Sequence, residues 1–330
     1  MKILVTGGAG FIGSHFVDLA IKKNKIKKII VIDNLEDGSL RNLDKALKSK
    51  KVKFVKADIR NFQNIKNLFK NIDKVVHFAA LSDVVPSIVE PKLYMDNNIN
   101  GTINILESMK INKVKKIIYA ASSSCYGIPN KFPTNENSPL DPRYPYAMSK
   151  LVCEEIIEHW SKVYGFDFLS LRLFNVYGTR SRTNSAYGAA LGVFLKQKIL
   201  NKPFTIVGNG NQKRDFIYVS DVCNAFYSAL NKNLTNQKFN IGFGKPRKVN
   251  EMVKIIGGTK VYVPKRPGEP DLTHADISKA KKLLSWKPKV TLEKGLNIVI
   301  KNINYWKDAP LWTPKKIKLA TKDWFKYIKK

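Results

Sequence analysis

The chain has 330 residues, 44% of them hydrophobic, which is enough for one large core or two modest ones. Its formal net charge of +32 raises the question of nucleic-acid binding, but the basic residues are mostly dispersed lysines, which favour a solvated surface. No apolar run approaches the roughly 20 residues that span a bilayer. The chain enters a strand at once, and its three cysteines show neither pairing nor metal-ligand spacing, so we expect a cytoplasmic protein without a metal.

The first predicted strand and helix are joined by a glycine-rich turn. Residues 2–6 are an apolar strand, residues 7–13 the turn and residues 14–22 a helix. Such a turn lets the backbone approach a pyrophosphate, and the helix N-terminus behind it offers free N–H groups. A second strand ends on Asp33, about twenty residues after Gly13, where a carboxylate accepts hydrogen bonds from an adenosine ribose and repels a 2′-phosphate. This order of elements predicts NAD binding over a plain strand-to-helix turn.

The same alternation continues along the chain. Apolar strands are predicted at 52–55, 74–78, 116–121 and 168–173, with helices between them at 62–70, 93–109 and 149–164. Repeated strand-helix units with apolar strands indicate a Rossmann-type, doubly wound parallel sheet in the α/β class, covered on both faces. Ligands are expected at the carboxyl ends of its strands.

Beyond about Asn175 the rhythm breaks, because loops lengthen and glycine and proline become frequent. We therefore expect a first domain at 1–175 and a smaller, interleaved α/β domain at 176–330, with segments around 213–243 returning to the first. In the tail from Lys315 to Lys330, apolar residues including Ile317 and Trp324 are spaced for one helical face. We expect that face to dock on the protein itself, since surface helices ordinarily bury such a stripe.

Tyr146 and Lys150 are the strongest candidates for chemistry. They lie four residues apart and project from one face of a helix. A free tyrosine, with a pKa near ~10, is a poor base at neutral pH. A nearby Lys150 ammonium and a positively charged nicotinamide would favour the phenolate. The serine run beginning at Ser122 follows a predicted strand at the same edge, where a hydroxyl could reach a reacting oxygen.

Together the glycine turn, the Ser122–Gly127 run and the Tyr146/Lys150 pair resemble the extended short-chain dehydrogenase/reductases. The likeness spans nearly the whole chain and is greatest to NAD-dependent nucleotide-sugar epimerases of the UDP-galactose 4-epimerase type. Further motifs that carry it are Asp58-Ile59-Arg60, His77-Phe78-Ala79-Ala80, Asn97-Asn98, Arg172-Leu173-Phe174-Asn175, Arg214-Asp215-Phe216 and Arg266-Pro267-Gly268-Glu269.

This resemblance implies a role for each matched residue. Tyr146 would be the acid/base, Lys150 would bind the nicotinamide ribose, and Ser122 or Ser123 would hydrogen-bond the sugar hydroxyl. NAD would lie against Gly7, Gly10, Phe11, Ile12, Gly13, Asp33, Asn34, Asp58, Ile59, Phe78, Ala79, Ala80, Asn98, Tyr146 and Lys150. A nucleotide-diphosphate sugar would contact Ser122, Tyr146, Asn175, Val207, Arg214, Arg266 and Glu269. Helices 93–109 and 149–164 resemble those through which family members form homodimers.

Two departures from the family pattern bear on the reaction. Related 4,6-dehydratases carry acidic residues just before the Tyr-Gly pair, whereas this chain has Ser123, Ser124 and Cys125 there. Without an acid in that stretch to protonate a leaving hydroxyl, dehydration is the weaker interpretation. Members restricted to unsubstituted hexoses tend to have a bulky aromatic near Thr273, so the smaller residue leaves room for an N-acetyl group. Ser82-Asp83 also departs from the epimerase pattern.

The sequence therefore predicts an NAD-dependent epimerase that inverts C4 of a nucleotide-diphosphate sugar, with a UDP-hexose or UDP-N-acetylhexosamine favoured. Three alternatives stay open: a 4,6-dehydratase or 4-ketoreductase on the same scaffold, a non-enzymatic NAD-binding regulator, and a basic nucleic-acid-binding protein. The intact Ser-Tyr-Lys set argues against the regulator, and only the net charge suggests the last.

Overall fold

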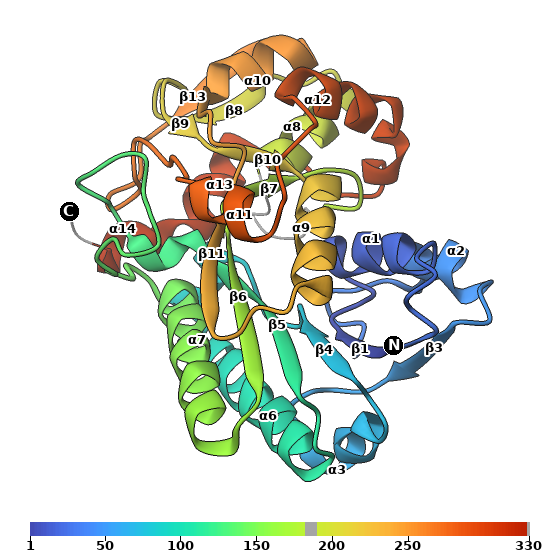
Figure 1. Ribbon diagram of the computed structural model, residues 1–330. Helices are drawn as coiled ribbons and strands as arrows, with labels where there is room; N and C mark the ends of the chain where they lie inside the picture. Colours follow the sequence, from blue (N-terminus) through green and yellow to red (C-terminus); the bar gives the residue numbers. More distant parts are fainter. Residues whose placement is uncertain (182–189, 329–330) are drawn as a thin grey trace.

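The computed structural model describes residues 1–181 and 190–328, and a seven-stranded parallel sheet forms its centre (Figure 1). In space the strands follow the order β3-β2-β1-β4-β5-β6-β11. The order changes direction between β1 and β4, which opens a crevice at the carboxyl ends of the strands. The predicted Rossmann-type fold is confirmed. The strands are β1 (Lys2–Thr6), β2 (Lys28–Asp33), β3 (Val52–Lys56), β4 (Lys74–His77), β5 (Lys116–Ser122), β6 (Asp167–Leu173) and β11 (Gln237–Ile241).

Helices cover both faces of this sheet because successive residues of each strand point to opposite sides. Ile3 and Val5 of β1 belong to the same core as Phe16 of the first helix. Leu4, between them, belongs to a second core with Leu106 on the other face. The first face carries α1 (Phe11–Ala20), α2 (Asp44–Leu47) and α9 (Val219–Asn231), and the second carries α3 (Phe62–Ile65), α6 (Gly101–Ile111) and α7 (Pro145–Tyr164).

The helix predicted at 93–109 contains a wider turn. It consists of α5 (Pro91–Met95), a π-helical turn at Asp96–Asn100 and then α6. The helix predicted at 62–70 likewise continues from α3 into a 3₁₀ turn. The remaining short helices of this half are α4 (Val84–Val89) and the 3₁₀ turns Leu40–Leu43, Lys66–Phe69 and Ser123–Tyr126.

The chain after β6 builds a smaller region above the carboxyl edge of the sheet (Figure 1). Its strands form three pairs: β7 (Asn175–Tyr177) with β10 (Phe216–Tyr218), β8 (Phe204–Val207) with β13 (Lys260–Val263), and β9 (Lys213–Arg214) with β12 (Arg247–Lys248). Its helices are α8 (Ala190–Ile199), α10 (Val249–Ile256), α11 (Ser278–Leu283) and α12 (Leu292–Lys301), followed by a 3₁₀ turn at Ile303–Trp306. Within the same stretch, α9 packs on the main sheet, and β11 extends this sheet by pairing with β6.

The C-terminal tail forms two short helices rather than the single predicted one. They are α13 (Pro314–Ala320) and α14 (Lys322–Tyr327), separated by Thr321, and the last two residues of the predicted span lie outside the described part. Ile317 and Trp324 are buried, so the expected docking of this stripe on the protein is confirmed. In the described ranges, no helix combines the length and the apolar character that a membrane span needs.

Candidate active site

The turn between β1 and α1 leaves no space for side chains at two of its glycines. Gly7 has a φ of +65°, and a Cβ there would lie 2.6 Å from the backbone nitrogen of Ala79. A Cβ on Gly13 would lie 2.1 Å from the carbonyl oxygen of Gly7. The helix begins at Phe11, earlier than the predicted Ser14, so the turn leads directly into the helix N-terminus. This geometry fits a bound pyrophosphate, whose oxygens need close backbone N–H groups.

Asp33 lies at the end of β2 and is 7% exposed. One of its carboxylate oxygens accepts a hydrogen bond from Ala9 N and the other from Leu35 N, both at 2.9 Å. Burial raises the pKa of Asp33, and these backbone donors work against that shift. Glu36 and Asp37 line the same end of the cleft. Three carboxyl groups at the expected ribose position favour NAD over NADP, since they repel a 2′-phosphate.

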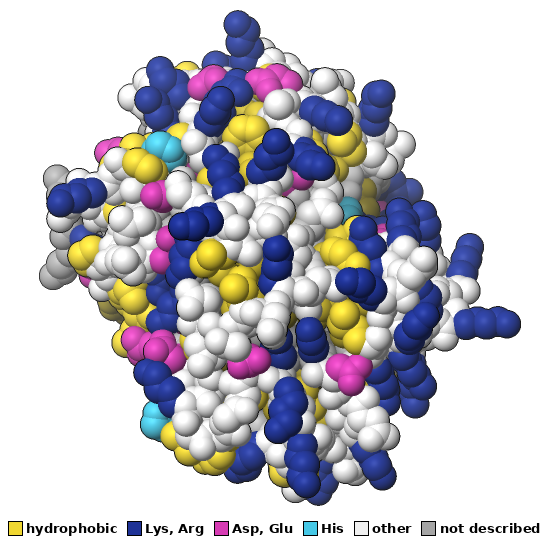
Figure 2. All heavy atoms as spheres, in the orientation of Figure 1, with side chains coloured by type: hydrophobic (Ala, Val, Ile, Leu, Met, Phe, Trp, Pro, Cys, Tyr) yellow, Lys and Arg dark blue, Asp and Glu magenta, His cyan; other side chains and the backbone are white. Residues whose placement is uncertain are grey.

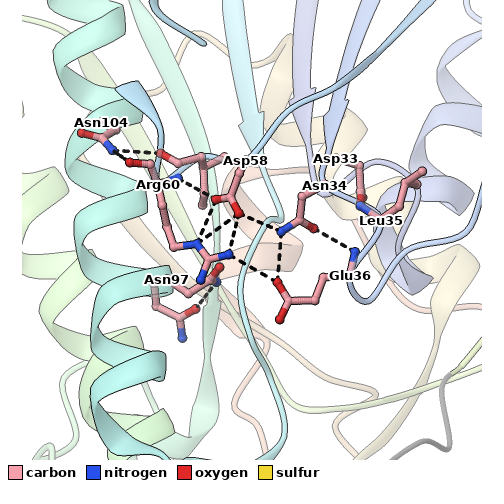
Figure 3. A network of polar contacts seen from close by, with 10 residues as sticks. Asp33, Asn34, Leu35, Glu36, Asp58, Arg60, Asn97 and Asn104 are labelled. Carbon is pink, nitrogen blue, oxygen red and sulfur yellow. Dashed lines mark hydrogen bonds and ion pairs between the residues drawn. The ribbon is translucent and has the colours of Figure 1, made fainter. Parts of the chain in front are cut away.

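Asp58 does not line the cleft but supports a residue that does (Figure 3). Its carboxylate pairs with Arg60 at 2.6 Å and accepts a hydrogen bond from Asn34 Nδ2 at 3.2 Å. The hydrogen bond with Arg60 lowers the pKa of Asp58 to about 2, so the carboxylate is ionised at neutral pH. Figure 3 shows Asn34 lying between Asp58 and Glu36, so Asp58 fixes the orientation of Asn34.

A cleft of about 390 Å³ runs along the carboxyl edge of the sheet past the glycine turn. It brings together most of the residues that the sequence predicted. From that set it is lined by Gly7, Gly10, Phe11, Ile12, Gly13, Asp33, Asn34, Ile59, Phe78, Ala79, Ala80, Ser122, Tyr146, Lys150 and Asn175. It does not bring in Asp58, Asn98, Ser123, Val207, Arg214, Arg266 or Glu269.

Tyr146 and Lys150 both belong to α7, which begins at Pro145 rather than at the predicted Ser149. Proline suits this first helical position because its φ is preset and its missing N–H has no partner there. Ser122 ends β5 and hydrogen-bonds Tyr146. Burial raises the pKa of Tyr146, while the bond with Ser122 opposes that rise. The phenol of Tyr146 and the hydroxyl of Ser122 therefore meet at the edge of the sheet.

Lys150 lies one helical turn after Tyr146 on α7 and is buried. Lys150 is 5% exposed, and its ammonium lies 4.3 Å from the centroid of the Tyr119 ring. Burial lowers the pKa of Lys150 to about 8. α7 directs the ammonium towards Tyr119. The hydrogen bond with Ser122 lowers the pKa of Tyr146 and so favours its phenolate.

The structure places Asn97, not Asn98, at the surface of the cleft. Asn98 is 1% exposed: its side chain accepts a hydrogen bond from Leu81 N at 2.8 Å and donates to Ser149 Oγ at 2.9 Å. It also donates to Leu81 O at 3.0 Å. Asn98 therefore ties the loop after β4 to α7, behind the cleft wall.

Three of the residues predicted to bind substrate line a second cleft of about 510 Å³ in the smaller region: Val207, Arg214 and Glu269. Arg214 pairs with Glu269 at 3.0 Å, and Arg266 approaches the same carboxylate at 3.7 Å. Two guanidinium groups meeting at one carboxylate favour an anionic ligand. Arg266 is 7% exposed and lies beside this cleft rather than on its surface.

Thr273 lies behind Asn175 and lines neither of these two clefts. Its hydroxyl donates to Asn175 Oδ1 at 2.8 Å and accepts a hydrogen bond from Asp215 N at 2.9 Å. The interpretation of Thr273 as space for an N-acetyl group therefore has no support from this geometry. Its hydroxyl orients the amide of Asn175 instead.

Several residues of the main cleft were not predicted as site residues. Asp83 and Ser181 come from loops, and Asn97 comes from the π-helical turn. Asp83 lines the cleft, and its charge raises the pKa of Tyr146. The departure at Ser82-Asp83 from the family pattern was the one signal in the sequence that pointed to it. Ser181 had no such signal.

The doubly wound sheet, the glycine turn, the terminal acid and the Ser-Tyr-Lys set define an extended short-chain dehydrogenase/reductase. Residues 4–299 match the family described as GDP-mannose 4,6 dehydratase, and the chain belongs to this family.

Named relatives include several epimerases. A putative UDP-glucose 4-epimerase of Methanocaldococcus jannaschii is 41% identical over 306 residues, which cover 90% of this chain and 97% of the relative. The solved UDP-glucose 4-epimerase of Thermotoga maritima, with UDP-glucose, has a TM-score of 0.85 and 34% identity over 93% of this chain and 99% of that one. The UDP-glucuronic acid 4-epimerase of Bacillus cereus, with UDP-glucuronic acid and NAD, gives the same TM-score, identity and coverages.

Proposed function

We propose that the chain is an NAD-dependent epimerase that inverts C4 of a nucleotide-diphosphate sugar, most fittingly a UDP-hexose or UDP-N-acetylhexosamine. The observation that carries this proposal is the meeting of Ser122, Tyr146 and Lys150 with the glycine turn in one cleft. The relatives named as UDP-sugar 4-epimerases support it at 41% and 34% identity.

The residues of the cleft fit NAD. Gly7 and Gly13 keep the turn free of side chains, and Asp33 offers a buried carboxylate where a ribose is expected. Lys150 lines the same cleft and, in this proposal, binds the second ribose. When bound, NAD supplies a hydride acceptor that can return the hydride to either face of a sugar.

The side chains of the site transfer the proton and bind the substrate. Tyr146 removes the proton of the C4 hydroxyl, which Ser122 hydrogen-bonds, and later returns a proton to the same oxygen. Between these steps the 4-keto sugar turns about its bond to the diphosphate and presents its other face. Arg214 and Arg266 anchor the diphosphate, which binds the substrate without fixing the sugar ring.

A 4,6-dehydratase is the second candidate, because Asp83 brings a carboxyl group to the cleft near Tyr146. Against it, the Ser123–Cys125 stretch offers no acid to protonate a leaving hydroxyl at C6. The two reactions differ in product: an epimer in one case and a 6-deoxy-4-keto sugar in the other.

The experiment is to incubate the purified protein with UDP-, dTDP-, CDP- and GDP-sugars, adding no NAD, and to follow C4 by proton NMR. We expect interconversion of two C4 epimers for at least one UDP-sugar. Tyr146→Phe is the control and should lower kcat by about 10² to 10⁴ while the NAD content stays unchanged. A 6-deoxy product, or full turnover by Tyr146→Phe, would overturn the proposal.

We further propose a homodimer formed through α6 and α7, which pack side by side. Both end in exposed apolar side chains, with Ile111 57% and Val163 56% exposed. Burying these against a second copy would remove apolar surface from water. Sedimentation of the protein should give twice the monomer mass, and Val163→Glu should give the monomer mass.

A further inference from the structure

The C-terminal helix α14 lies next to the loop that holds Arg266 and Pro267. The family match ends at residue 299, and α14 follows it. Trp324 is 2% exposed, whereas Phe325 and Tyr327 of the same helix are 45% and 58% exposed. Trp324 is therefore the large side chain that this helix buries in the interior of the protein.

Trp324 contacts two segments that border the site. Its indole Nε1 donates a hydrogen bond to Pro267 O at 2.8 Å, and its ring centroid lies 5.9 Å from the guanidinium carbon of Arg266. The ring of Tyr144, two residues before Tyr146, lies 5.8 Å away on another side. The helix also packs on α4, which begins directly after Asp83. The indole thus joins the Arg266 loop to the start of the catalytic helix.

We infer that Trp324 is a positioning residue for substrate binding, which holds the guanidinium of Arg266 in place for the diphosphate of the nucleotide sugar. This inference rests on the proposed function. The hydrogen bond fixes the backbone at Pro267, and the indole face limits the positions open to the neighbouring guanidinium. Arg266 then points to the carboxylate of Glu269, which it shares with Arg214.

A held arginine binds an anion more tightly than a mobile one because less conformational freedom is lost on binding. Burial lowers the pKa of Arg266 to about 10, which still leaves the guanidinium charged at neutral pH. The tail of the chain is therefore part of the substrate site through one side chain.

The test is a double-mutant cycle on the NAD-loaded protein, with UDP binding measured by titration calorimetry. Trp324→Ala should weaken UDP binding about tenfold, and Trp324→Phe, which keeps a ring but loses the N–H, should weaken it less. Arg266→Ala should weaken binding as well, and adding Trp324→Ala to it should cost little more. In turnover assays Trp324→Ala should raise KM for the UDP-sugar with a smaller effect on kcat.

Phe325→Ala, on the exposed face of the same helix, is the matched control and should leave UDP binding unchanged. If Trp324→Ala does not fold, Trp324→Phe enters the cycle in its place. Additive effects of the two substitutions, or no loss with Trp324→Ala, would overturn the inference while epimerase activity still stands. Failure of the wild type to bind UDP would overturn it too. Failure to epimerise any sugar, with UDP binding and the cycle as expected, would overturn only the proposed function.

Discussion

Two side chains next to Tyr146 change its pKa in opposite directions. Burial raises the pKa, the hydrogen bond with Ser122 lowers it, and the charge of Asp83 raises it further. In the proposed mechanism Tyr146 accepts a proton, and it can do so only when its phenol is deprotonated. Activity should therefore rise as the pH increases through the pKa of Tyr146. The pH dependence of kcat should therefore change when either Ser122 or Asp83 is replaced.

We expect Ser122→Ala and Asp83→Asn to shift the acidic limb of the kcat profile in opposite directions. Loss of the Ser122 hydrogen bond raises the pKa of Tyr146 and moves the limb to higher pH. Loss of the Asp83 charge lowers that pKa and moves the limb to lower pH. Steady-state kinetics across pH with each variant and the wild type would check this. Shifts in the same direction would contradict the assignment of Tyr146 as the base.

At the scale of residues, the sequence predicts the relative positions of side chains best where the residues belong to the same helix or strand. Tyr146 and Lys150 lie on one helix, so their spacing predicts that both project from one face of it. Asp83 reaches Tyr146 from the start of α4, across a tertiary contact that local patterns do not encode. The direction of the Lys150 ammonium towards Tyr119 also depends on packing between α7 and β5.

At the scale of elements, the π-helical turn at Asp96–Asn100 decides which asparagine faces the cleft. Helical spacing predicts a helix here correctly, but a turn with one more residue rotates every side chain after it relative to those before it. Apolar periodicity does not reveal such a turn. The family resemblance pointed to Asn98, whereas Asn97 lines the cleft. π-helical turns often occur at functional sites.

Asn98 should contribute to stability rather than to cofactor contact. Asn98→Ala would leave the part-buried N–H and carbonyl groups of Leu81 without their side-chain partner, and we expect a loss of about 1 to 2 kcal/mol in the free energy of unfolding. Asn100→Ala, an exposed position in the same turn, should change it by less than about 0.5 kcal/mol. Urea unfolding followed by circular dichroism measures both. Equal losses for the two variants would argue against this role.

At the scale of the whole molecule, the basic residues behind the net charge of +32 are dispersed along the sequence. Figure 2 shows Lys and Arg side chains scattered over the visible face, with Asp and Glu between them. A nucleic-acid footprint needs basic residues gathered along one stripe or patch. Dispersed lysines are instead typical of a solvated surface.

We therefore expect no stable complex with DNA or RNA at physiological salt, in spite of the charge. Gel shifts with a short duplex and a single strand, at about 50 and 150 mM salt, would test this. Weak binding that disappears at the higher salt agrees with a diffuse field. Retention of a tight complex at the higher salt would favour the nucleic-acid alternative.

The fold at this scale could be predicted because six strands with apolar residues alternate with helices; the seventh strand, β11, was not predicted. The site spans two regions, and local sequence patterns do not reveal how these regions approach each other. Asn175 follows β6 closely, and its position in the cleft was predicted. Arg214 and Arg266 lie in the smaller region, where short strands and long loops leave no periodic signal. The contact of Trp324 with Pro267 brings together residues far apart in the chain.

The most direct test of the account follows a deuterium label placed at C4 of the UDP-sugar that the protein turns over. An epimerase that keeps its NAD returns the same hydride, so we predict that both epimers keep deuterium at C4, with none lost when unlabelled NAD is added. Mass spectrometry and NMR would locate the label. Deuterium in the added NAD or in solvent, or at C6 of a deoxy product, would contradict the proposed epimerisation with a retained cofactor.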